Sequence, residues 1–303
     1  MLFAGRIYIM SFRIFTDTSA NLPAPYLAEH GVGVIPFHYE IDGEDMTCLD
    51  TEGFKYEADA YYAAIKSGTR VKTSQITPQE YIAFFEPILA GGEDLLFVGM
   101  SSGISNSYAS SEVAALALSE RFPERNIRSV DTLAASLGEG IAVMHAIEFR
   151  DAGLSLDETA DRLISMTQSM FQIVLIEDLM HLHRGGRVSA PKALLGTVLG
   201  IRPILKGDEG GHLVVYGKVR GRKNGLSLLA QKYAELVDRE KAHTVGIAYT
   251  DCAQDANDLG EMLKKAFEPK EMLIVRYEPV TGSYVGPGAL ALFFEGSGEV
   301  RKK

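Results

Sequence analysis

The stretch "DLLFVGMSSGISNSY" (residues 94–108) joins a run of apolar residues to a turn rich in glycine and serine, and then to a helical pattern. Residues 94–100 are of the right length for a buried strand, and the polar turn is typical of a connection from a strand to a helix. Parallel strands need helical crossovers of this kind. The stretch therefore indicates an α/β fold with a mainly parallel sheet.

The same alternation of strand and helix patterns extends outward from this stretch to both ends of the chain. The patterns toward the N-terminus predict strands over 12–16 and 32–41 and helices within 54–68 and 81–90. Toward the C-terminus they predict a strand near 127–131, helices over 134–152 and 156–170, and then further strands and helices. We expect two α/β domains, residues 11–167 with a mainly parallel sheet flanked by helices, and residues 168–297 with a mixed sheet.

Composition excludes several classes of protein. The chain has 303 residues, of which 46% are hydrophobic and 23% charged, and its formal net charge is −10. An acidic chain without a basic stripe is not expected to bind nucleic acid. No apolar run reaches the roughly 18 residues that a membrane span needs, so we expect no integral membrane segment. Cys48 and Cys252 lack the spacing of a metal or redox motif, which favours reduced thiols and a cytoplasmic location.

Most motifs of catalysis and of cofactor or metal binding are missing from the chain, which has no P-loop, no dinucleotide fingerprint and no H-E-x-x-H. The histidines of "HLH" (181–183) have no evident third ligand, so packing or loop roles are favoured over a metal site. We therefore expect neither a metal nor a cofactor.

One catalytic pattern does match and provides an alternative function. "GMSSG" (99–103) fits the G-x-S-x-G elbow of a serine hydrolase, with Ser101 as nucleophile, Asp131 as acid and either His145 or His181 as base. Against it, the pattern is short, and the following helix is expected only after residues 104–107, whereas an elbow needs the helix directly behind the serine. Four serines close together also suggest a cluster of donors rather than one activated hydroxyl.

Two clusters of hydroxyl side chains precede predicted helices. They are "TSQITP" (73–78) and "SSGISNSYASSE" (101–112). Hydroxyl groups and free backbone N–H groups at a helix start can bind a carboxylate or a phosphate. The alternative for each cluster is ordinary helix N-capping, which favours the same residue types.

An ordered series of short motifs spans residues 12–294: "TDTSANLP", "TSQITPQEY", "SSGISNSY", "VDTLAASLGEG", "LHRGGRVS", "LLGTVLGIRPIL", "KVRGRK" and "GPGALALFF". By this series the chain resembles the DegV family of fatty-acid-binding proteins. The resemblance implies two α/β domains with a long-chain fatty acid, such as palmitate or stearate, in a slot between them. It also implies that the chain is a carrier rather than an enzyme, one that presents its acyl group to a separate fatty acid kinase. A sugar-binding subunit similar to those of dihydroxyacetone kinases would need a histidine that bonds a ketone, and none can be singled out.

The resemblance also assigns residues to the site. It places Thr73 and Ser105 at the fatty-acid carboxylate, together with Tyr284. Tyr284 lies two positions before G-P-G, where the family usually has a histidine. A phenol donates a hydrogen bond but cannot carry a positive charge near pH 7, which leaves binding intact and puts the kinase partner in question. The supporting or partner-facing residues by the same resemblance are Ser74, Asn106, Ser107, Arg187 and Arg220.

Overall fold

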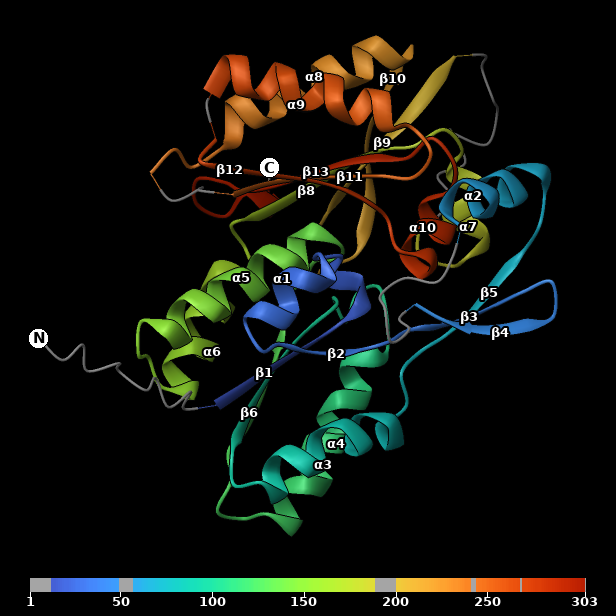
Figure 1. The fold of residues 1–303 in the computed structure, drawn as a ribbon. Helices are drawn as coiled ribbons and strands as arrows, with labels where there is room; N and C mark the ends of the chain where they lie inside the picture. Colours follow the sequence, from blue (N-terminus) through green and yellow to red (C-terminus); the bar gives the residue numbers. More distant parts are fainter. Residues whose placement is uncertain (1–11, 49–56, 189–199, 241–243, 268, 303) are drawn as a thin grey trace, which may run out of the picture.

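The computed structural model of the protein describes residues 12–48, 57–188, 200–240, 244–267 and 269–302 (Figure 1). The described strands form a parallel sheet of four strands, a mixed sheet of six and an antiparallel sheet of three. The predicted α/β class is confirmed. No helix within the described ranges is both long enough and apolar enough to cross a membrane.

The four-stranded sheet is parallel throughout and follows the order β2-β1-β6-β7. Its strands are β1 (Phe12–Asp17), β2 (Gly33–Ile35), β6 (Asp94–Gly99) and β7 (Ile127–Asp131). Helices cover both faces of this sheet: α3 (Pro78–Ala90) and α4 (Ser107–Arg121) on one side, α5 (Leu137–Asp151) and α6 (Leu156–Met166) on the other. The prediction of a mainly parallel sheet flanked by helices is confirmed.

Alternation along β6 explains why this sheet is covered on both faces. Leu95 and Phe97 pack in the cluster that contains the buried residues of α3 and α4, whereas Leu96 and Val98 pack in the cluster that contains those of α5 and α6. Successive side chains of a strand point to opposite faces. An uninterrupted apolar run therefore needs a helical layer on each side.

The strand predicted over residues 32–41 is wrong as a single element, because it divides into β2 and β3 (His38–Ile41). Pro36 has no N–H to continue a ladder, and the Phe37 N–H instead donates to Thr18 Oγ1 at 3.0 Å. β3 pairs with β4 (Glu44–Thr47) and β5 (Val71–Ser74) in the small antiparallel sheet, which was not predicted. Thr73 therefore lies on a strand and not at a helix start.

The remaining elements of the first half connect these strands. They are the 3₁₀ turn η1 (Thr18–Ala20), α1 (Ala24–Glu29) and α2 (Ala58–Ser67). Asp17 caps η1, since its Oδ1 accepts a hydrogen bond from the Ser19 N–H at 2.8 Å. The helix predicted within residues 54–68 is confirmed for the part that the structure describes.

The six-stranded sheet follows the order β10-β9-β8-β13-β11-β12, and only β11 and β12 pair in parallel. Its strands are β8 (Met170–Leu175), β9 (Ile201–Gly207), β10 (Leu213–Arg220), β11 (Thr244–Tyr249), β12 (Glu271–Arg276) and β13 (Leu290–Glu295). Helices α8 (Arg222–Leu236) and α9 (Ala253–Phe267) cover its outer face (Figure 1). The predicted mixed sheet is confirmed.

Three short elements complete the described chain. Helices α7 (Leu179–Arg184) and α10 (Pro279–Val285) lie beside the inner side of the mixed sheet, and the 3₁₀ turn η3 (Val300–Lys302) follows β13. Residues 189–199, within the C-terminal part where further strands and helices are predicted, lie outside the described residues. The proposed domain boundary at 167/168 falls between α6 and β8 and stays a prediction.

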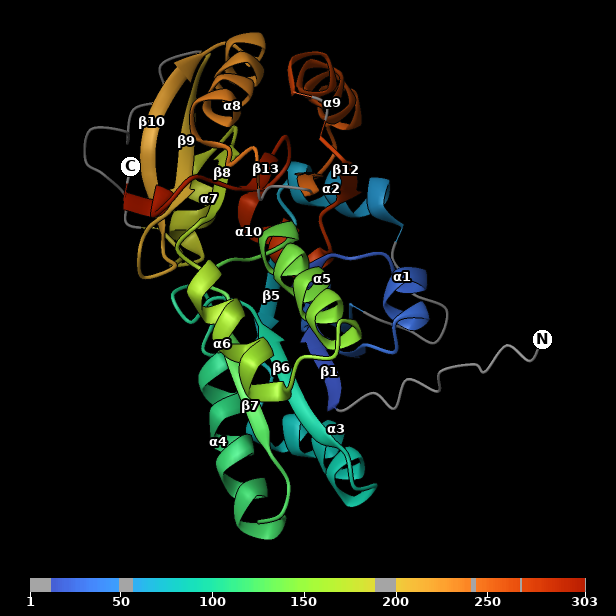
Figure 2. The same cartoon turned by 90° about the vertical axis from the view of Figure 1, so that its left-hand side faces the viewer.

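Helix α5 is the layer between the two large sheets (Figure 2). It packs against β1 and β6 on one side and against β8, β11 and β13 on the other. Gly140 allows α5 to pack closely against the turn η1, because a Cβ at this position would lie only 2.5 Å from the Ala20 carbonyl oxygen. Gly246 does the same from β11, where a Cβ would stand 2.7 Å from Leu137 Cβ. The two halves of the chain are therefore packed tightly against one helix.

A pair of buried carboxyl groups, Asp17 and Glu139, lies where β1 meets α5. Glu139 Oε1 accepts from Thr16 Oγ1 at 2.9 Å, and Glu139 Oε2 accepts from the Ser19 hydroxyl. Burial, and then the charge of Asp17, raise the pKa of Glu139 well above its usual value. Burial likewise raises the pKa of Asp17 to about 6, although backbone N–H groups of Ser19 and Met100 oppose the shift. Glu139 is therefore the better place for a proton shared by the pair.

We predict that these carboxyl groups make the protein less stable as the pH rises. A carboxyl whose pKa is raised on folding stabilises most below its unfolded pKa, and this contribution is lost as the pH passes the folded pKa. The free energy of unfolding should therefore fall from about pH 4 to above pH 6. Glu139→Gln cannot ionise, so its profile should be flatter when urea unfolding is measured between pH 4 and 8.

The matched control is Glu139→Ala, which also cannot ionise but leaves the Thr16 and Ser19 hydroxyls without their acceptor. We expect it to cost about 1–3 kcal/mol more than Glu139→Gln at every pH. A Glu139→Gln profile as steep as that of the wild-type chain would contradict a titrating Glu139.

Candidate functional site

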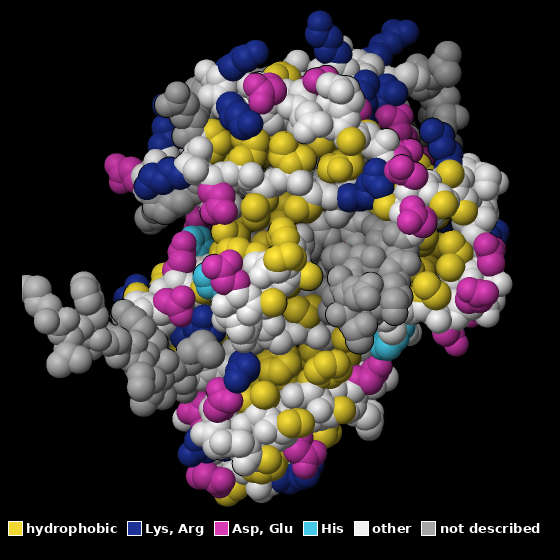
Figure 3. All heavy atoms as spheres, in the orientation of Figure 1, with side chains coloured by type: hydrophobic (Ala, Val, Ile, Leu, Met, Phe, Trp, Pro, Cys, Tyr) yellow, Lys and Arg dark blue, Asp and Glu magenta, His cyan; other side chains and the backbone are white. Residues whose placement is uncertain are grey.

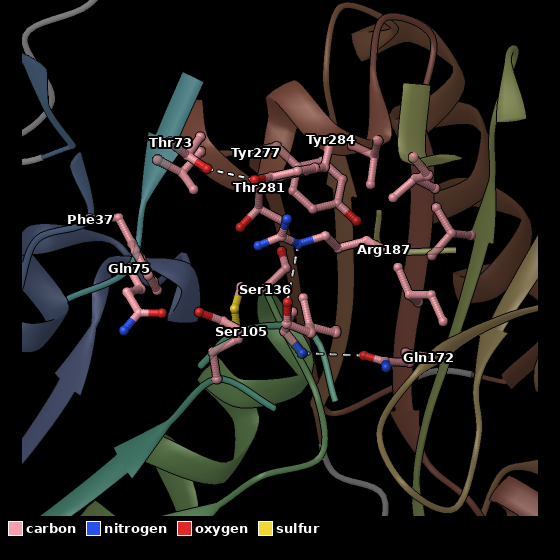
Figure 4. A pocket seen from close by; sticks show the side chains of 18 of the residues that line it. Phe37, Thr73, Gln75, Ser105, Ser136, Gln172, Arg187, Tyr277, Thr281 and Tyr284 are labelled. Carbon is pink, nitrogen blue, oxygen red and sulfur yellow. Dashed lines mark hydrogen bonds between the residues drawn. The ribbon is translucent and has the colours of Figure 1, made fainter. Parts of the chain in front are cut away.

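A cavity of about 240 Å³ lies between the two large sheets and takes residues from both halves of the chain (Figure 4). Strand β5, the turn after β6 and the loop before α5 contribute from the first half. Strand β8, the segment after α7 and helix α10 contribute from the second half. Most of the wall is apolar and includes Phe37, Met100, Val174, Leu182, Leu213 and Phe293.

Six of the eight predicted site residues line this cavity, namely Thr73, Ser74, Ser105, Asn106, Arg187 and Tyr284. A seventh, Ser107, stands directly behind Ser105. Arg220 does not line the cavity: it is exposed at the end of edge strand β10, and a partner-facing role for it stays a prediction. Strand β10 carries Arg220 out to the sheet edge, which a motif match along the sequence could not show.

Thr73 and Tyr284 form the first pair of donors. Thr73 Oγ1 and Tyr284 Oη lie 2.6 Å apart, and either can be the donor, so the end of β5 and helix α10 meet through two hydroxyls. The nearby helix start does not use Thr73, because Thr77 caps α3 in a capping box with Glu80. The capping alternative therefore applies to Thr77, and Thr73 is available to a ligand.

Ser105 and Ser107 form the second group of hydroxyls. Ser105 Oγ donates to Ser107 Oγ at 2.9 Å and accepts from the Ser107 N–H at 3.2 Å. Ser107 Oγ also accepts from the Ile76 N–H at 3.1 Å, which ties this turn to the segment after Thr73. Ser107 thus orients Ser105, whose hydroxyl lies at the cavity wall.

Arg187 places a cation beside these hydroxyls. Its guanidinium carbon lies 4.5 Å from the centre of the Tyr284 ring, within the range of a cation–π contact. Nε donates to the Ile104 carbonyl at 3.2 Å and Nη1 to the Gly185 carbonyl at 2.7 Å. Within the described ranges no carboxylate forms a salt bridge with Arg187. One end of the cavity therefore combines hydroxyl donors with a cation, which is suited to binding a carboxylate.

The polar side chains of the cavity wall that the predicted site did not include are those of Gln75, Thr281, Ser136 and Gln172, among others. Gln172 is the single polar residue of β8, "MFQIVL", where every side chain is buried. That lone amide in an apolar strand was a usable signal. No sequence signal indicated Ser136, because its position in the wall follows from an uncommon backbone conformation, with φ 53° and ψ −141°.

The geometry does not support the hydrolase alternative. Ser101 is fully buried, its hydroxyl donates to the Gly211 carbonyl at 2.9 Å, and α4 begins only at Ser107. His145 lies between Glu148 and Glu295, at 2.9 and 3.0 Å. Burial lowers the pKa of His145, but the hydrogen bonds that the imidazole donates to these two glutamates outweigh it and raise the pKa to about 9.

The remaining histidine and the two cysteines have structural surroundings. His181 lies on α7 with its Nδ1 2.9 Å from Arg184 Nη2, and burial together with Arg184 lowers its pKa. In the part of the chain that the structure describes, no group of three His, Cys, Asp or Glu side chains could hold a metal ion. Cys48 and Cys252 are free thiols, and Cys48 Sγ donates to Glu278 Oε2 at 3.2 Å.

A larger groove of about 1380 Å³ adjoins the cavity and shares Thr73, Tyr284 and Val285 with it. Its lining includes the cations Lys66, Arg70, Lys72, Arg184, Arg202 and Arg222. Five of these lie within salt-bridge distance of an acid. Lys72 pairs with Glu40 at 2.6 Å, Arg202 with Glu177 at 2.6 Å and Arg222 with Asp255 at 2.7 Å, whereas Lys66 and Arg184 lie 3.9 Å from Asp251 and Asp178. The hydroxyl end of the cavity thus borders a groove that is rich in cations. Elsewhere, on the face shown in Figure 3, acidic and basic side chains are interspersed.

Solved structures with this fold include two described as fatty-acid-binding DegV family proteins. The one from Streptococcus agalactiae is 27% identical with a TM-score of 0.81 and covers 95% of this chain and 100% of its own. The one from Thermus thermophilus is 26% identical with a TM-score of 0.83, again over 95% of this chain and 100% of its own.

Sequence comparison gives the same result. A DegV domain-containing protein from Clostridium perfringens is 32% identical over 285 residues, which are 94% of this chain and 97% of that protein. One from Lactococcus lactis is 33% identical over 287 residues, 94% of this chain and 97% of that protein. The family model described as "Uncharacterised protein, DegV family" matches residues 11–297. Together these matches show that the chain belongs to the DegV family.

Proposed function

We propose that this protein binds one long-chain fatty acid in the cavity between its two large sheets, with the carboxylate at Thr73, Ser105 and Tyr284. The observation that carries the proposal is the asymmetry of the cavity: its wall is largely apolar, and hydroxyl donors and Arg187 gather at one end. Such a site fits a molecule with one charged end and a long apolar remainder.

The two ends of the ligand have different energetic roles. Burying a methylene group contributes about 0.8 kcal/mol, so a tail of about fourteen contributes on the order of 11 kcal/mol before the costs of association. A hydrogen bond to a charged group contributes about 1.5–3 kcal/mol. The tail therefore provides most of the affinity, and the hydroxyls determine which end of the ligand lies near the groove.

The relatives support a carrier function without catalysis. The proteins from Streptococcus agalactiae and Thermus thermophilus, which share the fold over nearly the whole chain, are fatty-acid-binding proteins. Ser101 is bonded to a carbonyl rather than to a base. We propose that the chain itself is not an enzyme, and that it works in the cytoplasm, where its free thiols would stay reduced.

We further propose that the carboxylate is presented to a separate fatty acid kinase through the adjoining groove. Thr73 and Tyr284 belong to both the cavity and the groove, so a carboxylate between them would lie at the border. The cations of the groove would attract the phosphates of a nucleotide held by the partner. Tyr284 would leave the carboxylate without the positive charge that a protonated histidine could supply.

Removing single head-group donors should weaken fatty acid binding by a measurable amount. Thr73→Val and Tyr284→Phe each remove one hydroxyl and little packing, so each should cost about 1.5–3 kcal/mol, or roughly tenfold to a hundredfold in Kd. Titration of a fluorescent C16 or C18 fatty acid measures the change.

The control for this titration is Ser101→Ala, which removes a buried serine hydroxyl outside the cavity lining and should leave the Kd unchanged. If Thr73→Val and Tyr284→Phe are both silent while Ser101→Ala abolishes binding, the head group is not where we place it. If the wild-type chain takes up no C14–C18 acid, the fatty acid function itself is refuted.

Kinase coupling should depend on the cations of the groove. With a purified bacterial fatty acid kinase, ATP and palmitate, we expect acyl phosphate, trapped as the hydroxamate, to form at least tenfold more slowly with the double variant Lys66→Glu, Arg184→Glu. A tenfold effect corresponds to a loss of about 1.4 kcal/mol in the free energy of association between the two proteins. Lys264→Glu on α9 is the matched charge reversal outside the groove and should change nothing. If acyl phosphate forms neither with the wild-type chain nor with Tyr284→His, the partnership is refuted.

A further inference from the structure

Three residues of the cavity wall, Ser136, Gln172 and Thr281, carry a buried polar atom without a hydrogen-bond partner among the described residues, and two of them, Ser136 and Gln172, lie outside helix α10. Ser136 and Gln172 are only 1% and 2% exposed, and both line the cavity. Among the described residues, Ser136 Oγ and Gln172 Nε2 have no hydrogen-bond partner. An unpaired buried polar group costs about 1–3 kcal/mol. Figure 4 shows both residues in the wall of the cavity.

The orientation of the Gln172 amide is fixed by its neighbours. Its Oε1 accepts from the Ala135 N–H at 3.3 Å, so the other end of the amide is the NH₂ donor. A second donor, Arg301 Nη1, lies close to this NH₂ group. A Cβ added at Gly207 would be 2.5 Å from Gln172 Nε2 and 2.7 Å from Arg301 Nη1, so both groups lie next to the same glycine. Arg301 is itself 1% exposed and does not line the cavity. Gln172 Nε2 therefore lies near a second donor and has no acceptor among the described residues.

The backbone at Ser136 is strained in a way that holds its side chain in the wall. Ser136 has φ 53°, and Leu133 in the same loop also has φ 53°. Such conformations cost about 1–3 kcal/mol each and persist where the surroundings enforce them, often at ligand sites. Here Asp131 Oδ1 accepts from the Leu133 N–H at 2.9 Å, and Thr132 Oγ1 donates to the Gly99 carbonyl at 2.8 Å. The loop is thus built to keep Ser136 in place.

We infer that Ser136 and Gln172 form a second polar site in the cavity, distinct from Thr73, Ser105 and Tyr284, which selects an acyl chain that carries an oxygen, as a hydroxyl or a ketone. This inference rests on the proposed fatty acid function and makes it more specific. A methylene beside these donors would leave them unpaired, whereas an oxygen would accept from Gln172 Nε2 and Ser136 Oγ. The nearby charge of Arg301 further favours an electron-rich atom. Thr73, Ser105 and Tyr284 remain the site of the carboxylate.

The test is competition between stearic acid and a series of monohydroxystearic acids with the hydroxyl at successive carbons. If one oxygen satisfies the buried donors, one or two neighbouring isomers should bind about fivefold to a hundredfold more tightly than stearic acid, and the other isomers should not. Ser136→Ala and Gln172→Met should each reduce the logarithm of the affinity ratio between the preferred isomer and stearic acid by at least half, and stearic acid should still bind. Ser101→Ala, which removes an equally buried hydroxyl, should keep the full preference.

The outcomes separate the two proposals. If stearic acid binds and no isomer is preferred, or if the preference survives in both variants, the second polar site is refuted and the fatty acid function stands. If neither stearic acid nor any isomer binds, both proposals fail. Both variants must show a wild-type far-UV circular dichroism spectrum, and Gln172→Glu, which keeps the acceptor for Ala135 N–H, replaces Gln172→Met if that variant does not fold. Gln172→Glu should then also reduce the preference at pH 8.

Discussion

The arrangement of the cavity depends on one buried carboxylate, that of Glu278. It accepts from the N–H groups of Val280 and Thr281, both at 2.6 Å, and so caps helix α10. The backbone N–H of Glu278 donates to Asn21 Oδ1 at 2.8 Å, and Cys48 Sγ donates to Glu278 Oε2. A carboxylate that is 1% exposed must have such partners, and here both halves of the chain supply them. Helix α10, which carries Tyr284, is thereby fixed relative to β5, which carries Thr73.

Two tyrosines of α2 extend this connection, because Tyr61 Oη donates to the Pro279 carbonyl at 2.7 Å and Tyr62 Oη to the Tyr277 carbonyl at 3.0 Å. The segment around Glu278 is thus tied to residues that precede α5 as well as to its own half of the chain. A ligand between Thr73 and Tyr284 would touch both sides of this junction. Fatty acid binding should therefore report on the packing of the two halves as well as on the hydroxyls.

Sequence patterns predicted the order of most elements, because long apolar runs such as 94–100 and helical spacings act locally. They failed at residues 32–41, where Pro36 and the Thr18 hydroxyl, distant in sequence, divide one expected strand into two. Motif resemblance named Thr73, Ser105 and Arg187, which share one cavity, but it could not show that Arg220 lies outside that cavity, since the direction of β10 is a tertiary property. Gln172 could have been noticed as the lone amide of an apolar strand, whereas Ser136 gave no sequence signal, and the lack of an acceptor for either donor is recognised only when all their neighbours are known.

The most direct test of the central claim is a crystal structure of the protein after incubation with palmitate. The account predicts continuous density for one acyl chain between the two large sheets, with carboxylate oxygens within hydrogen-bond distance of Thr73 Oγ1, Ser105 Oγ and Tyr284 Oη. A chain bound only in the groove beside Arg184, or a carboxylate at Gln172 with the tail at Thr73, would contradict it.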